Sequence, residues 1–575
     1  MNGKQLDGAQ ALIKCLEREG IEIMFGLSGG AAIPIFDALV TTNTKIKFVL
    51  VRHEQGAAHM ADGYARATGK PAAVLVTSGP GATNTLTGIM TAHMDSVPMI
   101  VISGQSVSWM LGKDAFQEAD IFGITMPVVK HSYLVKKSND IPRVAREAYY
   151  IATTGRPGPV LIDLPKDVSS APCTVDLYQE MDLPGYQPNK QAVNREKILE
   201  VAEALTKSRK PVLLVGHGVI IADACEPVKA LAEKLNAPVV NTLLGKGGFP
   251  ETHRLALGML GMHGTAYATK AVVECDLILS IGSRFDDRII GQPDKFCRNA
   301  TKIHIDVDPA EIGKMIKPDI TIVGDARAVI EELNKHVTRL DTAEWLEHLA
   351  GYKKKYPLHY KKQGGLKMQH IMDELYKLTG GKAVAVTDVG QHQMWAAQFW
   401  KTDGRLDWLS SGGAGTMGYG LPAAIGAQFG RPKSTVVLFC GDGGFQMTMS
   451  ELATACLHKL PLKIIVLNNH YLGMVRQWQQ LFYDDRRSGV DLEGNPDFAR
   501  LIECYENGRG LTLKRPADVR KILQRALDYN DGPCLVNAEV VKTDNVFPMV
   551  PAGRALEDLL VEPPRHRMEK PTGST

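Results

Sequence analysis

Two oxygen-bearing side chains, Asp442 and Asn469, each follow an apolar run in the C-terminal part of the chain. Asp442 comes just after residues 436–440, and Asn469 comes just after residues 464–467. If these runs are neighbouring strands of a parallel sheet, the right-handed crossover returns Asn469 to the edge where Asp442 lies. Carboxylate and amide oxygens suit Mg²⁺, which usually takes one or two protein carboxylates and fills its remaining positions with phosphate and water. The pattern therefore predicts a magnesium site, whereas a lone Asp-Gly or Asn-Asn pair would indicate only a helix cap and a turn.

Glycine-rich turns surround this candidate metal site in the sequence. Gly443 and Gly444 follow Asp442 directly and would let the backbone approach a diphosphate closely. Residues 411–428 begin with a glycine-rich loop and continue in a helical pattern. The alternative interpretation of that loop is a flexible turn.

Glu54 is the candidate acid of the N-terminal part. It follows the predicted strand at residues 48–51 and begins a helix whose apolar stripe includes Ala57, Ala61 and Tyr64. A glutamate in a first helical turn often does no more than complement the helix dipole. The alternative is a carboxyl group at the turn between a strand and a helix, where it can hold and release a proton.

The elements that must position these residues follow one pattern along the whole chain. Short apolar, β-branched runs end in Gly- or Asp-rich turns and alternate with helical patterns, which indicates parallel sheets covered on both faces. We therefore predict an α/β protein of three doubly wound parallel-sheet domains. The predicted divisions are residues 1–170, 190–345 and 368–550 with a tail at 551–575, and the predicted linkers lie near residues 169–194 and 351–367. Further predicted strands lie at residues 73–77, 160–163, 212–216, 277–282, 303–306 and 383–387.

Composition excludes several classes of protein. The 575 residues exceed one domain, and 66 Lys plus Arg against 63 Asp plus Glu give a net charge of +3, which is too balanced for a nucleic-acid binder. No apolar run approaches the length of a membrane helix. Nine scattered cysteines without a C-x-x-C pair argue against a zinc site and for a reducing compartment. Since the N-terminus also lacks the pattern of a signal or transit peptide, we expect a cytoplasmic protein that acts on small molecules.

Sequence blocks along nearly the whole chain, from about residue 4 to 550, carry a resemblance to a known family. The chain resembles the acetohydroxyacid synthases, also called acetolactate synthases, in their FAD-containing biosynthetic form, which belong to the thiamine diphosphate (ThDP) enzymes. One departure is Ser28 in FGLSGG, where relatives usually have proline. The blocks are RHEQGAAHMADGYARATGKP, VTSGPGATN, KDAFQEAD, GRPGPVLIDLPKDV, MLGMHG, SRFDDRIIG and NNHYLGMVRQWQQLFY.

The resemblance implies ThDP, Mg²⁺ and FAD as cofactors. Asp442, Asn469 and the main-chain carbonyl of Tyr471 would hold the metal, and Glu54 would bind the pyrimidine ring of ThDP. Met417 would support the thiazolium ring. Since the reaction transfers no net electrons, FAD would be structural, and the turn at residues 216–218 is by itself only a weak dinucleotide signal. The other implied ThDP contacts are Val389, Gly390, Gln391, His392, Gly415, Gly443 and Gly444, and the implied FAD contacts are Arg156, Gly216, Gly218, Met262, His263, Arg284, Asp286, Asp306 and Asp325.

The implied reaction decarboxylates pyruvate and joins the two-carbon unit to a second 2-oxoacid. Pyruvate as acceptor gives 2-acetolactate, and 2-oxobutyrate gives 2-aceto-2-hydroxybutyrate, at the start of branched-chain amino acid biosynthesis (isoleucine, valine and leucine). Arg288 would bind the carboxylate of the acceptor, and Trp478 would be the wall that favours the ethyl group, unless it only packs in the core. Gln117 would reach the site across a subunit interface, and Lys166 would line it.

The resemblance also implies partners and leaves two alternatives. A homodimer would be the minimum active unit, with a homotetramer also compatible, and feedback control would need a separate small regulatory subunit. An FAD- and ThDP-dependent pyruvate oxidase shares all three cofactors but is disfavoured by the SRFDDRIIG and NNHYLGMVRQWQQLFY blocks. A non-catalytic flavoprotein scaffold is disfavoured by the joint presence of Glu54, Asp442 and Asn469.

Overall fold

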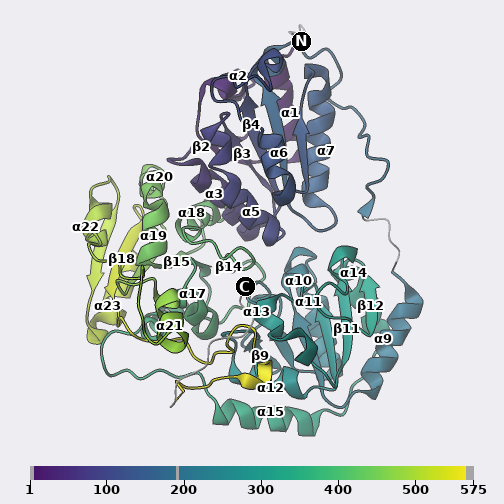
Figure 1. The fold of residues 1–575 in the computed structure, drawn as a ribbon, viewed down its shortest axis with the longest axis vertical. Coiled ribbons are helices and arrows are strands. Elements are labelled where there is room, and N and C mark those ends of the chain that lie inside the picture. The colour runs from purple at the N-terminus through teal and green to yellow at the C-terminus, as the bar shows by residue number, and fades with distance from the viewer. Residues whose placement is uncertain (1–4, 189–192, 565–575) are drawn as a thin grey trace.

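The computed structural model describes residues 5–188 and 193–564 and divides them into three α/β domains (Figure 1). Each domain contains a six-stranded sheet in which every strand pairs in parallel with its neighbours. The predicted fold class is confirmed. Residues 1–4, 189–192 and 565–575, which the sequence analysis assigned to the predicted domains, the first linker and the tail, lie outside the described residues.

The N-terminal domain has the strand order β2-β1-β3-β4-β6-β5. Its strands are β1 (Ile23–Gly26), β2 (Lys47–Leu50), β3 (Ala72–Val76), β4 (Met99–Gln105), β5 (His131–Leu134) and β6 (Pro159–Pro165). Its helices are α1 (Gly8–Glu19), α2 (Ile33–Thr41), α3 (Glu54–Thr68), α4 (Pro80–Thr83), α5 (Leu86–Met94), α6 (Ile121–Thr125), α7 (Ile141–Thr153) and α8 (Lys166–Ser170).

The middle domain has the strand order β12-β11-β10-β7-β8-β9. Its strands are β7 (Pro211–Val215), β8 (Val239–Asn241), β9 (Ala256–Met259), β10 (Leu277–Ile281), β11 (Thr301–Asp306) and β12 (Ile320–Val323). Its helices are α9 (Arg195–Lys207), α10 (His217–Ile221), α11 (Cys225–Leu235), α12 (Ala266–Glu274), α13 (Asp287–Ile290), α14 (Ala326–His336) and α15 (Ala343–Lys355).

The C-terminal domain has the strand order β14-β13-β15-β16-β18-β17. Its strands are β13 (Val384–Thr387), β14 (Trp408–Leu409), β15 (Val436–Gly441), β16 (Lys463–Asn468), β17 (Arg509–Leu513) and β18 (Cys534–Glu539). Its helices are α16 (Met368–Thr379), α17 (Gln391–Phe399), α18 (Gly420–Gly430), α19 (Asp442–Thr448), α20 (Leu452–Leu457), α21 (Gly473–Phe482), α22 (Phe498–Glu503) and α23 (Val519–Asp528).

Most of the predicted strands match the structure to within one or two residues. β15 and β16 are neighbours, as the metal prediction requires, and they pair in register from Val437 with Lys463 to Gly441 with Leu467. The second predicted linker begins too early, because α15 continues to Lys355. Trp345 and Leu349 are buried on the apolar side of that helix, against the middle domain. The lysines at the end of the helix did not indicate this packing, so the sequence suggested a linker there.

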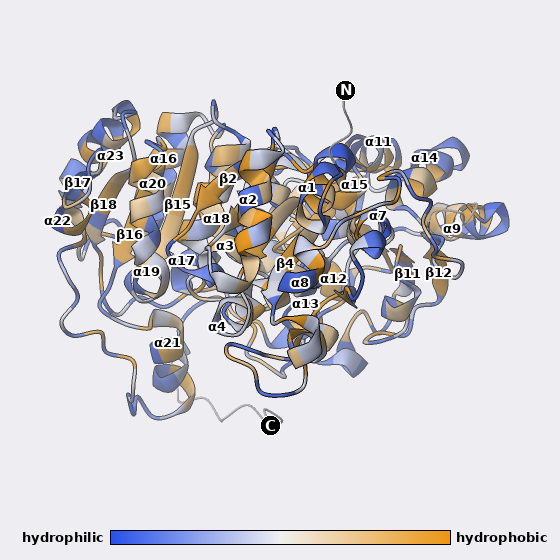
Figure 2. Cartoon of the chain, turned by 90° about the horizontal axis from the view of Figure 1, so that it is seen from above, coloured by the Kyte–Doolittle hydropathy of each residue, from blue (hydrophilic) through white to orange (hydrophobic). Residues whose placement is uncertain are grey.

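The N-terminal and C-terminal domains share a core. Phe25 and Tyr64 of the first belong to the same buried apolar cluster as Leu421 and Phe445 of the second. α3 lies against α18 so closely that a Cβ at Gly426 would be 1.9 Å from the carbonyl oxygen of Met60. Figure 2 shows hydrophobic colour along β15 and β18 and hydrophilic colour on the outer helices α14 and α23. Within the described part of the chain, no helix is long and apolar enough to span a membrane.

Candidate active site

The ends of β15 and β16 bring Asp442 and Asn469 to one edge of the C-terminal sheet. Asp442 begins α19 and is 1% exposed, and its Oδ2 accepts a hydrogen bond of 2.7 Å from Nδ2 of Asn495. Its Oδ1 is buried and has no hydrogen-bond partner among the described residues. Leaving a buried carboxylate oxygen unpaired is unfavourable, so this atom fits a ligand for a cation.

The electrostatics of Asp442 also fit a metal ion. Burial raises the pKa of this carboxyl group, although the amide of Asn495 opposes the shift. A divalent cation would reverse the balance and hold the group ionised. The described residues contain no group of three or more His, Cys, Asp or Glu side chains placed to bind a metal. A site with one carboxylate therefore suits Mg²⁺, which takes further ligands from a bound diphosphate.

A cavity opens beside Asp442, and we call it the C-terminal cavity because the C-terminal domain alone lines it. The walls come from the turns that follow β13, β15 and β16 and from the glycine-rich loop before α18. Of the residues predicted to bind the metal and the ThDP diphosphate, only Gly415 is not in this wall. The predicted residues that line it are Val389, Gly390, Gln391, His392, Met417, Asp442, Gly443, Gly444, Asn469 and Tyr471.

The two glycines after Asp442 have different reasons to be glycine. A Cβ at Gly443 would lie 2.8 Å from Leu472 and 3.5 Å from Met417, which both line the C-terminal cavity. A Cβ at Gly444 would lie only 2.1 Å from Oδ1 of Asp388. Gly444 is thus required by the packing of Asp388, whereas a side chain at Gly443 would press against residues that line the C-terminal cavity.

Asp388 and Asn495 are site residues that the sequence analysis missed. The Asp388 carboxylate accepts hydrogen bonds from the backbone N–H groups of Val389 (2.8 Å), Gly418 (3.0 Å) and Gly420 (2.8 Å), and burial raises its pKa to about 6. It therefore fixes the loop that presents Met417 to the C-terminal cavity. Its position directly after the predicted strand at 383–387 was a usable signal. No pattern in the sequence indicated Asn495, which lies in the loop between α21 and α22.

Glu54 lies outside the C-terminal cavity of its own chain. It begins α3, is 7% exposed, and accepts a hydrogen bond of 3.0 Å from Nδ2 of Asn84. The backbone N–H groups of Arg52 and His53, just before it, each donate to Glu451 of the C-terminal domain at 3.0 Å. The C-terminal domain thus fixes the backbone just before Glu54, although the Glu54 carboxyl group does not line that domain's cavity.

A second cavity, which we call the middle cavity, lies between the N-terminal and middle domains. Its wall includes five of the residues predicted to bind FAD: Arg156, Gly218, Arg284, Asp306 and Asp325. Arginines fit a dinucleotide's phosphates, and carboxylates fit its ribose hydroxyls. Burial raises the pKa of Asp306 to about 6.

Four other predicted FAD contacts, Gly216, Met262, His263 and Asp286, do not line the middle cavity. A Cβ at Gly216 would lie 2.1 Å from the carbonyl oxygen of Gly282, so this glycine allows two turns of the middle sheet to pack together. His263 is fully buried, and burial lowers its pKa to about 4. Gly216 thus serves packing, whereas Gly218 of the same turn lines the middle cavity.

The residues predicted to select substrates lie outside both cavities. The exposed side chain of Arg288 comes within 4.0 Å of the sulfur of Met262. Trp478 is half-buried on α21 and packs against Phe482, with ring centroids 5.1 Å apart. Gln117, in the loop after β4, has a positive φ of 57°, and Lys166 is half-buried at the start of α8. One chain therefore does not gather the substrate residues at the C-terminal cavity.

Comparison with known proteins assigns the three domains. Residues 6–124, 198–333 and 388–538 match the N-terminal TPP binding domain, the central domain and the C-terminal TPP binding domain of thiamine pyrophosphate enzymes. Thiamine pyrophosphate is another name for ThDP. The chain is therefore built as a ThDP-binding protein.

Relatives narrow this assignment. The chain is 47% identical to an acetolactate synthase large subunit of Mycobacterium tuberculosis, over 97% of this chain and 91% of the relative. Identity to the acetolactate synthase large subunit of Haemophilus influenzae is 45%, over 98% of this chain and 99% of the relative. Identity to the acetolactate synthase large subunit of Lactococcus lactis is 44%, over 97% of this chain and 96% of the relative. The chain therefore belongs to the acetolactate synthase family of thiamine pyrophosphate enzymes.

Proposed function

We propose that the chain decarboxylates pyruvate and transfers the two-carbon unit to a second pyruvate or to 2-oxobutyrate, with ThDP, Mg²⁺ and FAD bound. The products are 2-acetolactate and 2-aceto-2-hydroxybutyrate, the first acetohydroxyacids of branched-chain amino acid biosynthesis. The observation that carries the proposal is the unpartnered, buried Oδ1 of Asp442 in a cavity that Gly443 and Met417 also line. A metal ion that anchors a diphosphate would satisfy that oxygen, and the reaction type is that of the family.

The residues of the C-terminal cavity bind and orient the cofactor. Asp442, Asn469 and the carbonyl of Tyr471 would hold Mg²⁺, and Met417 would support the thiazolium ring from the loop that Asp388 fixes. When bound, ThDP would supply a nucleophilic carbon for the ketone of a 2-oxoacid and an acceptor for the electron pair left by CO₂. The chain's own task here is to hold that carbon in one orientation in a cavity lined mainly by apolar atoms.

Glu54 moves the proton in this proposal. Its carboxyl group, held by Nδ2 of Asn84, would share a proton with the pyrimidine ring of ThDP and so set the protonation of that ring. Because Glu54 and Asp442 lie apart within one chain, the Glu54 that serves each C-terminal cavity would come from a second copy. A homodimer, alone or as half of a tetramer, is the minimum active unit in this proposal.

Exposed apolar side chains support the second copy. Phe116 is 89% exposed in the loop that also carries Gln117, and Leu457, Met447 and Val475 are exposed on the C-terminal domain. Association with a second copy would remove such exposed apolar side chains from water. A partner that buries Phe116 would bring Gln117 to its active site.

Two residues are assigned to the acceptor. Arg288 would bind the carboxylate that pyruvate and 2-oxobutyrate share, because its planar guanidinium forms two parallel hydrogen bonds. Trp478 would pack against the methylene that only 2-oxobutyrate has. Lys166 would line the same site. A separate small regulatory subunit, suggested by the large-subunit naming of the relatives, would provide feedback control.

An assay for 2-acetolactate with each cofactor left out in turn tests the proposal. We expect product from pyruvate without oxygen, loss of product when ThDP or Mg²⁺ is omitted, and loss after removal of FAD. Bleaching of the flavin by pyruvate without acetolactate formation would identify a pyruvate oxidase instead. Absence of CO₂ release would leave a non-catalytic flavoprotein.

A further inference from the structure

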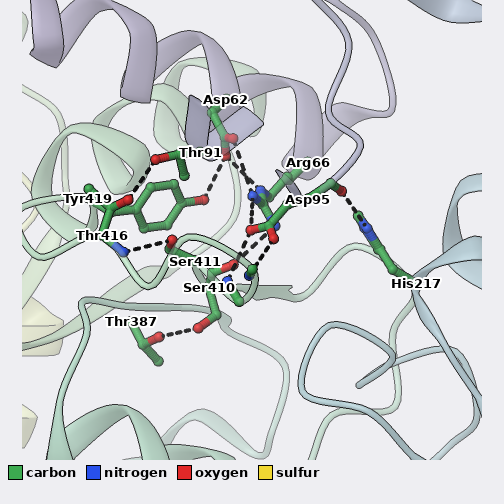
Figure 3. A network of polar contacts seen from close by, with 12 residues as sticks. Asp62, Arg66, Thr91, Asp95, His217, Thr387, Ser410, Ser411, Thr416 and Tyr419 are labelled. Atoms are coloured by element: carbon green, nitrogen blue, oxygen red, sulfur yellow. Dashed lines mark hydrogen bonds and ion pairs between the residues drawn. The ribbon is translucent and has the colours of Figure 1, made fainter. Parts of the chain in front are cut away.

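A buried polar network joins all three domains beside the middle cavity (Figure 3). Its centre is Arg66 on α3, whose guanidinium donates to Asp62 at 2.6 Å, to Asp95 at 2.8 Å and to the carbonyl of Ser410 at 3.0 Å. The hydroxyl of Tyr419 also donates to Asp62, at 2.8 Å. Because these charges are almost entirely buried, loss of any one of them would leave its partner uncompensated.

Asp95 connects this network to the loop of residues 411–418, which we call the shared loop. The Asp95 carboxylate accepts hydrogen bonds from the backbone N–H groups of Gly412 (3.0 Å) and Gly413 (2.7 Å). Farther along, the hydroxyl groups of Thr416 and Thr91 lie 2.7 Å apart. The N-terminal domain thus holds the shared loop at two points.

The start of the shared loop also contacts the walls of the middle cavity. A Cβ at Gly413 would lie 2.9 Å from Oδ1 of Asp95 and 3.0 Å from Nη2 of Arg284, and a Cβ at Gly412 would lie 2.7 Å from Leu244. Asp95, Arg284 and Leu244 all line the middle cavity. The loop backbone is therefore packed directly behind that wall, with no room for a side chain between them.

His217 of the middle domain completes the connection. Its Nδ1 lies 3.0 Å from the backbone oxygen of Asp95, and since a carbonyl can only accept, Nδ1 must carry the proton. His217 itself lines the middle cavity. Asp95 is thus fixed from the N-terminal domain by Arg66 and from the middle domain by His217.

The far end of the shared loop reaches the other cavity. Met417 lines the C-terminal cavity, and the next residue, Gly418, donates to Asp388. We propose that the shared loop couples the two cavities and that Asp95 is the positioning residue of this coupling. A ligand that presses on Asp95 and Arg284 in the middle cavity fixes Gly412 and Gly413, and through them the placement of Met417 against ThDP. This gives the proposed flavin a role without electron transfer, and it rests on the proposed function.

The test is the affinity for ThDP in the presence of Mg²⁺, measured by calorimetry on the full chain with FAD removed and with FAD saturating. For the wild type we expect FAD to tighten ThDP binding by about 5-fold or more, the lower end of typical coupling between sites. ThDP must tighten FAD binding by the same factor, because coupling is reciprocal. Flavin fluorescence measures this second affinity.

Two variants break the connection in different ways. Asp95→Asn removes the carboxylate, and Gly413→Ala keeps every charge but inserts a methyl group between Asp95 and Arg284. In either, we expect the coupling factor to fall below about 2-fold while ThDP still binds. Glu251→Gln is the matched control, because Glu251 also makes a buried ion pair at a domain boundary, with Lys246, but lines neither cavity. It should retain the wild-type factor.

The outcomes separate this inference from the proposed function. Equal ThDP affinity with and without FAD in the wild type would overturn the coupling and leave the proposed function intact. Wild-type coupling in Gly413→Ala would overturn the role of the shared loop, even if Asp95→Asn does not fold. A wild-type chain that binds no ThDP would overturn both.

Discussion

The C-terminal cavity and the middle cavity differ in how many domains build them. The first is lined only by residues of the C-terminal domain, from Met368 to Val475, at the carboxyl ends of adjacent strands of one sheet. The second is larger, about 290 Å³ against about 60 Å³, and takes its walls from two domains. In the middle cavity, the turn at residues 153–157 faces the loops that follow the middle strands.

This difference determines how each cavity responds to an amino-acid substitution. Sheet register fixes Asp442 and Asn469 in the C-terminal cavity, so a change at either residue alters a ligand contact and leaves the domain intact. Domain packing fixes the middle cavity, so a change there alters ligand affinity and the interface together. The predictions below test that distinction.

The largest effect is expected at Asp442. Asp442→Ala removes the carboxylate through which Mg²⁺ anchors the diphosphate, so ThDP and Mg²⁺ affinity should fall together by at least about 100-fold, equivalent to roughly 3 kcal/mol. FAD affinity measured without ThDP should be unchanged. Calorimetry gives both values. The control is Asp491→Ala, because Asp491 is an exposed aspartate that pairs with Tyr471 near the same site. Unchanged ThDP affinity in Asp442→Ala would contradict the metal role.

Glu54→Gln should lower kcat by at least about 100-fold while ThDP still binds, because an amide keeps the shape of the side chain but cannot exchange a proton with the pyrimidine. Steady-state acetolactate formation measures kcat, and calorimetry measures binding. Asn84→Ala, which only releases the carboxyl group from its hydrogen bond, should have a smaller effect. A kcat near that of the wild type would remove Glu54 from the reaction.

Arg156→Met tests the middle cavity. Nη1 of Arg156 bonds to Glu311 at 2.6 Å and to Asp308 at 3.1 Å, and Nε donates to Ser96 at 2.8 Å. Since bonds to charged groups contribute about 1.5 to 3 kcal/mol, the variant should bind FAD about 10-fold more weakly and unfold at lower denaturant concentration. Arg143→Met, which breaks ion pairs within one domain, is the control. Weaker FAD binding with unchanged stability would refute the link between this cavity and domain packing.

The same difference explains what the sequence could predict. Asp442 and Asn469 were found because parallel strands bring their carboxyl ends to one edge, a rule that needs no knowledge of distant packing. The middle cavity was harder, because its residues come from two domains, and contacts taken from the family resemblance at Met262 and Asp286 lie outside its wall. Asp95 carried no signal at all, since its partners Arg66 and Gly413 are joined to it only by tertiary structure.

Trp478 and Arg288, which lie outside both cavities, should separate acceptor selection from acceptor binding. A wall against one methylene discriminates by about 1 to 3 kcal/mol, so Trp478→Leu should shift the products toward 2-acetolactate by about 10-fold with pyruvate consumption kept. Arg288→Lys should reduce both products, because an ammonium group cannot bind the shared carboxylate through two parallel bonds. A competition assay with both acceptors measures the ratio.

Either result can be contradicted. An unchanged product ratio in Trp478→Leu would reduce that residue to packing against Phe482. Selective loss of one product in Arg288→Lys would remove Arg288 from a carboxylate site common to both acceptors.

The smallest expected effect is a pH dependence of stability at His217 in the middle cavity. Burial, with help from the Arg66 cation, lowers the pKa of His217 to about 4 from an ordinary value near 6.5. The folded state therefore binds fewer protons than the unfolded state between these values, so stability is complete above about pH 6.5 and is lost as pH falls toward 4. Between pH 7.5 and pH 6 this loss is about 1 kcal/mol.

The variant His217→Gln tests this dependence, because it keeps an N–H donor for the Asp95 carbonyl but cannot titrate. Its free energy of unfolding, measured by denaturant at the two pH values, should fall by about 1 kcal/mol less than that of the wild type. His359→Gln, at an exposed position, should behave like the wild type. Equal pH dependence in His217→Gln and the wild type would mean that His217 is not held neutral by its surroundings, and the middle cavity would then be more open to water than its packing indicates.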